Sequence, residues 1–188
     1  MGLSIKFTSE SSVQFPDKAK STLKLDVNGM QITQSSLLNK DKIAITVNGM
    51  KIPFDDKQTK IVMESAYLET VATRLLIDAK EFMLNPLGEI DVNGHKAAGI
   101  KVSAKGHGDV SVYFDKETGL MARVEYRDVD LMTCQEYLAS KTLSKYKEFN
   151  GIQTPTKEVQ TKDGAKFMDS ELLEVKYSEK LDPATFEP

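Results

Sequence analysis

Apolar and polar residues alternate along most of this chain, which is the pattern of half-buried β-strands. Two strands predicted in the first third carry three apolar residues each at alternate positions: Leu23, Leu25 and Val27, then Ile43, Ile45 and Val47. Successive side chains of a strand point to opposite faces, so a slip of one residue would invert each apolar face. The pattern therefore predicts the register of the strands as well as their existence.

Asn-Gly and Asp-Gly pairs mark the ends of many of these strands. The tripeptide Val-Asn-Gly occurs three times, at 27–29, 47–49 and 92–94, and Asn150-Gly151 and Asp163-Gly164 are close relatives of it. These pairs tolerate the positive φ angles that a type I′ turn requires at both central residues. We therefore expect two-residue β-hairpins at these places, and a longer hairpin turn at 115–119.

Residues 55–84 depart from the alternation. Their apolar residues recur with a helical period: Ile61, Met63, Tyr67, Leu68, Val71, Leu75 and Leu76. No Gly or Pro interrupts this stretch before Asn85-Pro86, where the helical region is expected to end. We therefore predict one helical insertion at about 56–84, packed on the sheet. The β-branched pair Val71 and Thr73 marks a point where it could divide into two helices.

After Gly88 the strand pattern resumes and continues almost to the end of the chain. Ile100 and Val102, and then Val110, Val112 and Phe114, form the next apolar faces. Strands on both sides of one helical insertion predict an α+β fold that is mainly β. We expect residues 1–188 to form a single domain, with one curved antiparallel sheet of about eight to eleven strands.

Composition, charge and the length of apolar runs bear on nucleic-acid binding and on membrane-spanning segments. The chain has 188 residues, of which 40% are apolar and 28% charged, as in a globular domain. Its net charge of −3 has both signs interspersed and no basic stripe, so the sequence gives no case for nucleic acid. It also has no run of about 18 apolar residues, and we expect no membrane-spanning segment.

Catalytic and metal-binding signatures are scarce. We expect His95 and His107 to be solvated loop residues, and Cys134 to be a small strand residue. Asp115 and Glu117 fall in a hairpin turn, where Asp commonly bonds the local backbone. No P-loop, nucleophile elbow or zinc-binding motif occurs. We therefore predict no enzyme activity, no cofactor and no metal site.

Several segments of the second half occur in a familiar order. They are residues 87–89 (LGE), 92–94 (VNG), 99–102 (GIKV), 113–120 (YFDKETGL), 146–156 (YKEFNGIQTPT) and 181–186 (LDPATF). Together they resemble the LolA-like family of bacterial envelope proteins, related to the outer-membrane lipoprotein-sorting factors. The resemblance is strongest at 113–120 and 151–155 and weaker before residue 80, although Phe15-Pro16-Asp17-Lys18 echoes the family near the start.

The resemblance implies a half-barrel whose mouth is covered by helices and whose apolar interior receives acyl chains. It also implies an exported protein of the periplasm or cell envelope, with neither catalytic residues nor a cofactor. The chain begins inside a strand pattern, at residues 4–8, with no signal peptide before it. We therefore expect the native leader and first structured segment to be missing from this sequence.

Pattern and resemblance together predict the residues of a hydrophobic interior. They are Leu25, Val27, Ile45, Val47, Tyr67, Leu68, Val71, Leu75, Ile100, Val102, Val112 and Phe114. Two functions stay open. The interior binds a lipid or a lipoprotein acyl chain, or it is filled by its own side chains and the protein is an interaction or sensing module of the envelope. Leu, Ile, Val and Met dominate these positions with few large aromatic residues, which favours a cavity; a hydrolase is the least favoured class.

Overall fold

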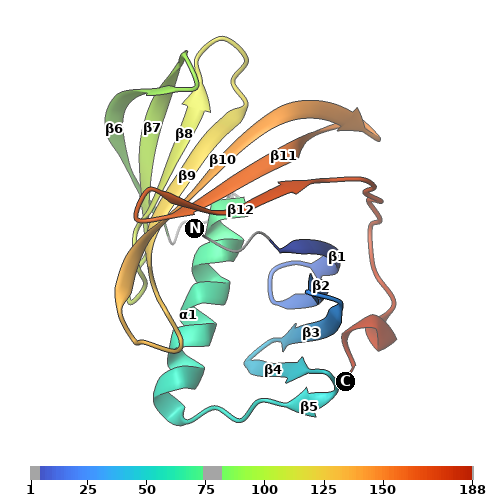
Figure 1. The fold of residues 1–188 in the computed structure, drawn as a ribbon. Coiled ribbons are helices and arrows are strands. Elements are labelled where there is room, and N and C mark those ends of the chain that lie inside the picture. Colours follow the sequence, from blue (N-terminus) through green and yellow to red (C-terminus); the bar gives the residue numbers. More distant parts are fainter. Residues whose placement is uncertain (1–4, 74–81, 188) are drawn as a thin grey trace. The chain divides into compact units, whose positions relative to one another are not determined.

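The computed structural model describes residues 5–73 and 82–187. In these residues the chain forms two antiparallel sheets, one α-helix and one short 3₁₀ helix (Figure 1). It divides into two compact units, and each is described by itself below. Residues 1–63 with 178–188 form the first, and residues 64–177 form the second.

The first unit contains a five-stranded sheet in which every strand pairs with its neighbour in the chain. Its strands are β1 (Lys6–Gln14), β2 (Lys18–Val27), β3 (Met30–Asn39), β4 (Lys42–Val47) and β5 (Met50–Lys51). Leu25 lies opposite Ile32, and Ser36 opposite Ile45, so the predicted apolar residues of β2 and β4 share one face. Within this sheet these residues therefore lie on one face, as the alternation predicts.

The opposite face of this sheet holds the C-terminal 3₁₀ helix η1 (Pro183–Phe186). The Asn39 side-chain amide donates to the carbonyl oxygen of Phe186 at 3.2 Å, and Nζ of Lys20 donates to that of Glu187 at 2.8 Å. Lys20 and Asn39 alternate with the apolar-face positions of their strands, which places η1 on the polar face. Phe186, with 1% of its surface exposed, is the only fully buried residue described in this unit.

The second unit contains a curved seven-stranded sheet (Figure 1). Its strands are β6 (Met83–Val92), β7 (His95–Ser103), β8 (Val110–Asp115), β9 (Met121–Val129), β10 (Glu136–Phe149), β11 (Ile152–Lys162) and β12 (Ala165–Glu171). They too follow each other in chain order. This order needs only hairpin connections, because antiparallel neighbours can be joined by tight turns.

The helix α1 (Asp56–Thr73) is the only α-helix among the described residues. Its first turn is capped reciprocally by Asp55 and Gln58. The Gln58 amide donates to the Asp55 carboxylate at 2.7 Å, and the Asp55 amide donates to the Gln58 side-chain oxygen at 3.1 Å. In the second unit, Leu68, Val71 and Ala72 of α1 pack on one face of the seven-stranded sheet.

All five predicted Asn-Gly and Asp-Gly turns connect strands as expected. Their first residues have φ between 47° and 54°, and their glycines between 78° and 87°. The predicted longer turn at 115–119 also joins two strands, and Gly119 has φ 70°. The expectation of a mainly antiparallel β fold with one helical insertion is confirmed.

Two parts of the fold prediction are wrong. The strands form two sheets rather than one, because the helical insertion separates β5 from β6 and all pairing is between chain neighbours. Residues 83–84, predicted as helix, begin β6, and residues 74–81 lie outside the described residues. Pro86 was expected to stop the helix but lies within β6. There it is tolerated because β6 is an edge strand, and its register shifts between Pro86 and Gly88.

Candidate ligand-binding surfaces

Each sheet presents one apolar face, and the predicted interior residues are divided between the two. Leu25, Val27, Ile45 and Val47 lie on the five-stranded sheet, whereas Ile100, Val102, Val112 and Phe114 lie on β7 and β8 of the seven-stranded sheet. Their expected position on a single sheet face is therefore wrong. Tyr67, Leu68 and Val71 belong to α1, and Leu75 lies outside the described residues.

The apolar face of the five-stranded sheet is incompletely covered. It combines residues of β2, β3 and β4, and all of them are half-buried: Leu23, Leu25, Val27, Ile32, Leu38, Ile43, Ile45 and Val47. Ser21, Gln34 and Ser36 lie among them on the same face. Apolar surface that remains partly exposed commonly marks a binding surface. This face is the most accessible of the predicted apolar surfaces.

The apolar face of the seven-stranded sheet is closed by α1. Leu68 is 1% exposed, Val102 2% and Val112 0%. Val71, Val110, Val124 and Tyr126 belong to the same buried cluster, and Tyr67 and Phe114 pack against it. Side chains of the helix and sheet therefore fill this core where it is described.

Glu69 is the first of three polar anchors that hold α1 on this sheet. The hydroxyl of Tyr126 donates to Oε1 of Glu69, and Nζ of Lys141 donates to Oε2 of the same carboxylate. Burial and the Glu69 carboxylate both raise the pKa of Tyr126 far above its usual value. The phenol consequently stays protonated and can act as a donor.

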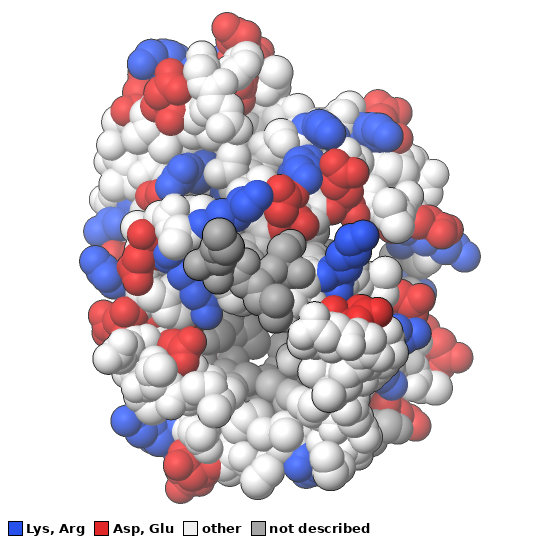
Figure 2. All heavy atoms as spheres, in the orientation of Figure 1, with Lys and Arg blue, Asp and Glu red and all other residues white. Residues whose placement is uncertain are grey.

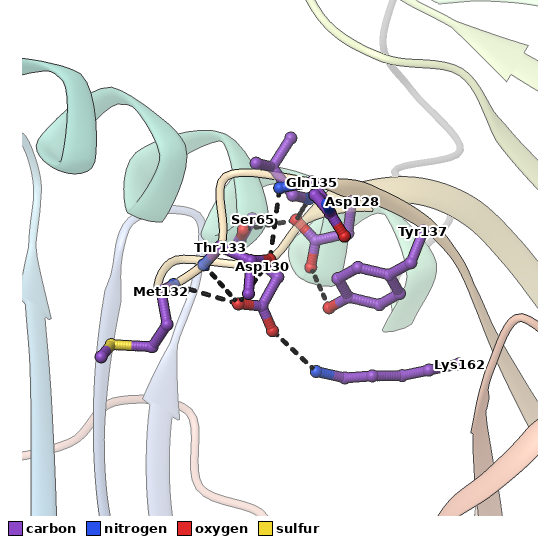
Figure 3. A network of polar contacts seen from close by, with 9 residues as sticks. Ser65, Asp128, Asp130, Met132, Thr133, Gln135, Tyr137 and Lys162 are labelled. Carbon is purple, nitrogen blue, oxygen red and sulfur yellow. Dashed lines mark hydrogen bonds and ion pairs between the residues drawn. The ribbon is translucent and has the colours of Figure 1, made fainter.

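The second anchor is Asp128 at the end of β9 (Figure 3). One carboxylate oxygen accepts from the Ser65 hydroxyl of α1 at 2.6 Å, and the other accepts from Tyr137 of β10 at 3.0 Å. Burial first, and then the Asp128 charge, raise the pKa of Tyr137. Asp130 lies in the loop after β9. Nζ of Lys162, at the end of β11, lies 3.5 Å from the Asp130 carboxylate and 4.5 Å from the centre of the Tyr137 ring.

The third anchor joins α1 to the loop between β7 and β8. Glu64 accepts from the Gly108 amide at 2.8 Å, and its other oxygen lies 2.8 Å from Nδ1 of His107. The His107 ring stacks on Tyr67 at a centroid distance of 3.5 Å. His107 is therefore part of the helix–loop contact and not the simply solvated residue expected. His95 is largely exposed, at the start of β7.

The contact between Glu69, Tyr126 and Lys141 is absent from the residues predicted from the sequence. Its signal was present in β10, where Tyr137, Ala139, Lys141 and Leu143 occupy alternate positions. Lys141 is thus a cation at an apolar-face position, and it is 7% exposed. A buried lysine of this kind needs a charged partner, which only the folded structure identifies as Glu69.

Cys134 is exposed in the turn between β9 and β10, so the expectation that it is a strand residue is wrong. Within residues 5–73 and 82–187, no group of three or more His, Cys, Asp or Glu side chains is placed to hold a metal ion. No helix in that part of the chain has the length and hydropathy to cross a membrane. Figure 2 shows acidic and basic side chains interspersed on the face in view, without a patch of one sign that would attract a polyanion.

Comparison with known proteins shows likeness at the level of the fold. No family model matches the chain, and a search of curated proteins gives no match either. Among solved structures it is similar to a DUF1329 family protein from Desulfovibrio piger. That pair has a TM-score of 0.52 and 18% identity, covering 97% of this chain and 81% of the other.

Two further solved structures resemble the chain less closely. One is a domain from Vibrio parahaemolyticus provisionally named an outer membrane lipoprotein-sorting protein, with a TM-score of 0.47, 12% identity, and coverage of 90% and 81%. The other is a LolA superfamily protein from Nitrosomonas europaea, with a TM-score of 0.46, 8% identity, and coverage of 98% and 88%. Proteins of the kind that the sequence resemblance named are therefore among the structural neighbours of this chain.

Proposed function

We propose that this chain binds a hydrophobic ligand, either a lipid or a lipoprotein acyl chain, in the periplasm or cell envelope and without catalysing a reaction. The observation that carries the proposal is the half-buried apolar face of β2, β3 and β4. Burying an acyl chain there would gain about 0.8 kcal/mol per methylene. The resemblance of the sequence to lipoprotein-sorting proteins supports an acyl chain as the occupant.

The helix-covered face supplies a second apolar surface. α1 packs on the seven-stranded sheet through side chains, whereas strands are joined by ladders of backbone hydrogen bonds. A helix held in this way can part from the sheet without breaking a ladder, as active-site and binding lids do. An acyl chain would then contact the valines that α1 covers.

A second candidate function, an interaction or sensing module with no ligand, also has a specific observation in its favour. Val110 and Val112 are 0% exposed and Val124 is 1% exposed, so the core under α1 is well packed. The two functions differ in whether an apolar molecule is taken up at all.

Uptake of a fluorescent fatty acid tests the proposal, with a matched pair of variants in β4. Ile45 lies on the half-buried apolar face, and its neighbour Thr46 points to the opposite face. We expect saturable uptake by the native chain. Ile45→Glu should weaken binding at this face at least about tenfold, because a carboxylate in an apolar contact loses hydration. Thr46→Glu should leave uptake near the native level.

No uptake by the native chain, or equal loss in both variants while circular dichroism shows both folded, would contradict ligand binding on this face. A bulky residue at Val112 would test ligand binding less clearly than Ile45→Glu. That side chain is 0% exposed, so Val112→Trp would overpack the core under α1.

A further inference from the structure

Two donors on neighbouring strands of the seven-stranded sheet converge on one carboxylate. Tyr126 of β9 and Lys141 of β10 point to the same face, since Tyr126 pairs with Ala139, two residues before Lys141. Each donates to a different oxygen of the Glu69 carboxylate. Tyr126 and Lys141, called the donor pair below, thus form a site that is complementary to a carboxylate in size and charge.

The two sides of this contact differ in exposure. The Lys141 side chain is 8% exposed, whereas that of Glu69 is 44% exposed. Withdrawing a buried lysine from its partner leaves a desolvated charge, which is costly. Glu69 can turn its carboxylate toward water at much lower cost. The donor pair is therefore the fixed part of the contact, and the carboxylate is the exchangeable part.

The surroundings of the donor pair are apolar. Lys141 lies opposite Val124 in the sheet register, and Val124 lies opposite Val112. Leu68 of α1 packs in the same buried cluster as both valines. A ligand with a carboxylate at the donor pair would thus place an attached alkyl chain against apolar side chains.

We propose that Tyr126 and Lys141 bind the carboxylate of a fatty acid, which enters by exchange with the carboxylate of Glu69. This inference rests on the proposed function at its second apolar surface, the helix-covered face, and names the ligand class there as long-chain carboxylic acids. A carboxylate pairs with the charge of Lys141 both before and after the exchange, and the Glu69 carboxylate turns to solvent when the ligand is bound. It also couples ligand entry to the contact between α1 and the sheet, since Glu69 belongs to the helix.

Calorimetric titration with dodecanoic acid and with 1-dodecanol at neutral pH tests this site. The two probes share a chain length and differ in the charge of the head. We expect the native chain to bind the acid about tenfold more tightly than the alcohol, since a hydrogen bond to a charged group is worth more than a neutral one. Lys141→Met should abolish that preference.

Two more variants sharpen the test. Glu69→Gln removes the competing carboxylate, so it should bind the acid about tenfold more tightly than the native chain. Lys157→Met is the control. Lys157 is also ion-paired, to Asp169, but it lies on the opposite face of the sheet. It should keep the native preference for the acid, which excludes a general effect of net charge.

The outcomes separate this inference from the proposed function. Equal affinity of the native chain for acid and alcohol, or a preference that survives in Lys141→Met, would overturn the carboxylate site while hydrophobic binding stands. Binding of neither probe would overturn the proposed function itself. If Lys141→Met does not fold, the native comparison and Glu69→Gln decide.

Discussion

Cys134 occupies in one turn the position that Gly119 occupies in another. In both turns an aspartate accepts from the amide of a threonine three residues later, Asp115 from Thr118 at 2.8 Å and Asp130 from Thr133 at 3.0 Å. The next residue then donates its amide to the aspartate carbonyl oxygen. That residue has a positive φ, 70° for Gly119 and 55° for Cys134. Only glycine adopts this conformation without steric cost.

Two single substitutions, glycine for Cys134 and cysteine for Gly119, should therefore change the free energy of unfolding in opposite directions. Cys134→Gly should stabilise the fold by about 1 kcal/mol, since relief of left-handed strain exceeds the added entropy of an unfolded glycine. Gly119→Cys should destabilise it by a similar amount. Urea unfolding of both variants and the native chain measures the effect. A loss of stability in Cys134→Gly would show that the turn at 130–134 is unstrained.

Lys141 shows, also at the scale of single residues, what the sequence could indicate about the site. Its position in the alternating pattern of β10 marks it as a cation among apolar-face residues. The pattern could not identify Glu69 as its partner, or Tyr126 as the second donor to Glu69, because these contacts join residues 72 and 57 positions apart in the chain. Contacts of this separation depend on how the helix packs on the sheet.

Among the elements, the hairpins were the most predictable. Each Asn-Gly or Asp-Gly pair satisfies a local backbone requirement, and alternation along a strand sets its face. The end of α1 and the start of β6 were not predictable in this way. Met83 and Leu84 are apolar and continue the helical pattern, yet they lie in an edge strand, 65% and 60% exposed. Periodicity alone does not separate such a strand from a helix.

The two aspartate turns should make the hairpins at 115–119 and 130–134 sensitive to acid. Hydrogen bonds from the Thr118 amide hold the pKa of Asp115 below its usual value, and those from Thr133 and Met132 do the same for Asp130. A lowered folded-state pKa contributes stability that is present above the unfolded value, about 4. This stability is lost as pH falls through the folded value.

We therefore expect the urea midpoint of the native chain to fall between neutral pH and about pH 3. The double variant Asp115→Asn with Asp130→Asn should show a smaller fall, because asparagine still accepts the hydrogen bonds but does not titrate. Asp109, Asp169 and Glu171 also have lowered pKa values, so part of the fall should remain. An identical fall in both proteins would exclude the two turns as its cause.

For the whole molecule, the predicted and the observed fold agree in class, which is mainly antiparallel β with one helical insertion. The likeness to the DUF1329 family protein extends over 97% of the chain at 18% identity, which shows a shared fold and leaves function to the chain's own surfaces. Those surfaces are the half-buried face around Leu25 and Ile45 and the helix-covered face with its donor pair. Ligand binding could not be predicted from pattern alone, because alternation does not distinguish a face covered by protein from one covered by a ligand.

Native mass spectrometry of the protein purified without detergent shows whether this chain carries a hydrophobic ligand. We expect a population of molecules heavier than the bare chain by the mass of an acyl lipid. This population should be reduced in Ile45→Glu and retained in Thr46→Glu. A spectrum of the folded native protein that contains the bare chain alone, before and after incubation with dodecanoic acid, would contradict hydrophobic ligand binding and leave the interaction module as its function.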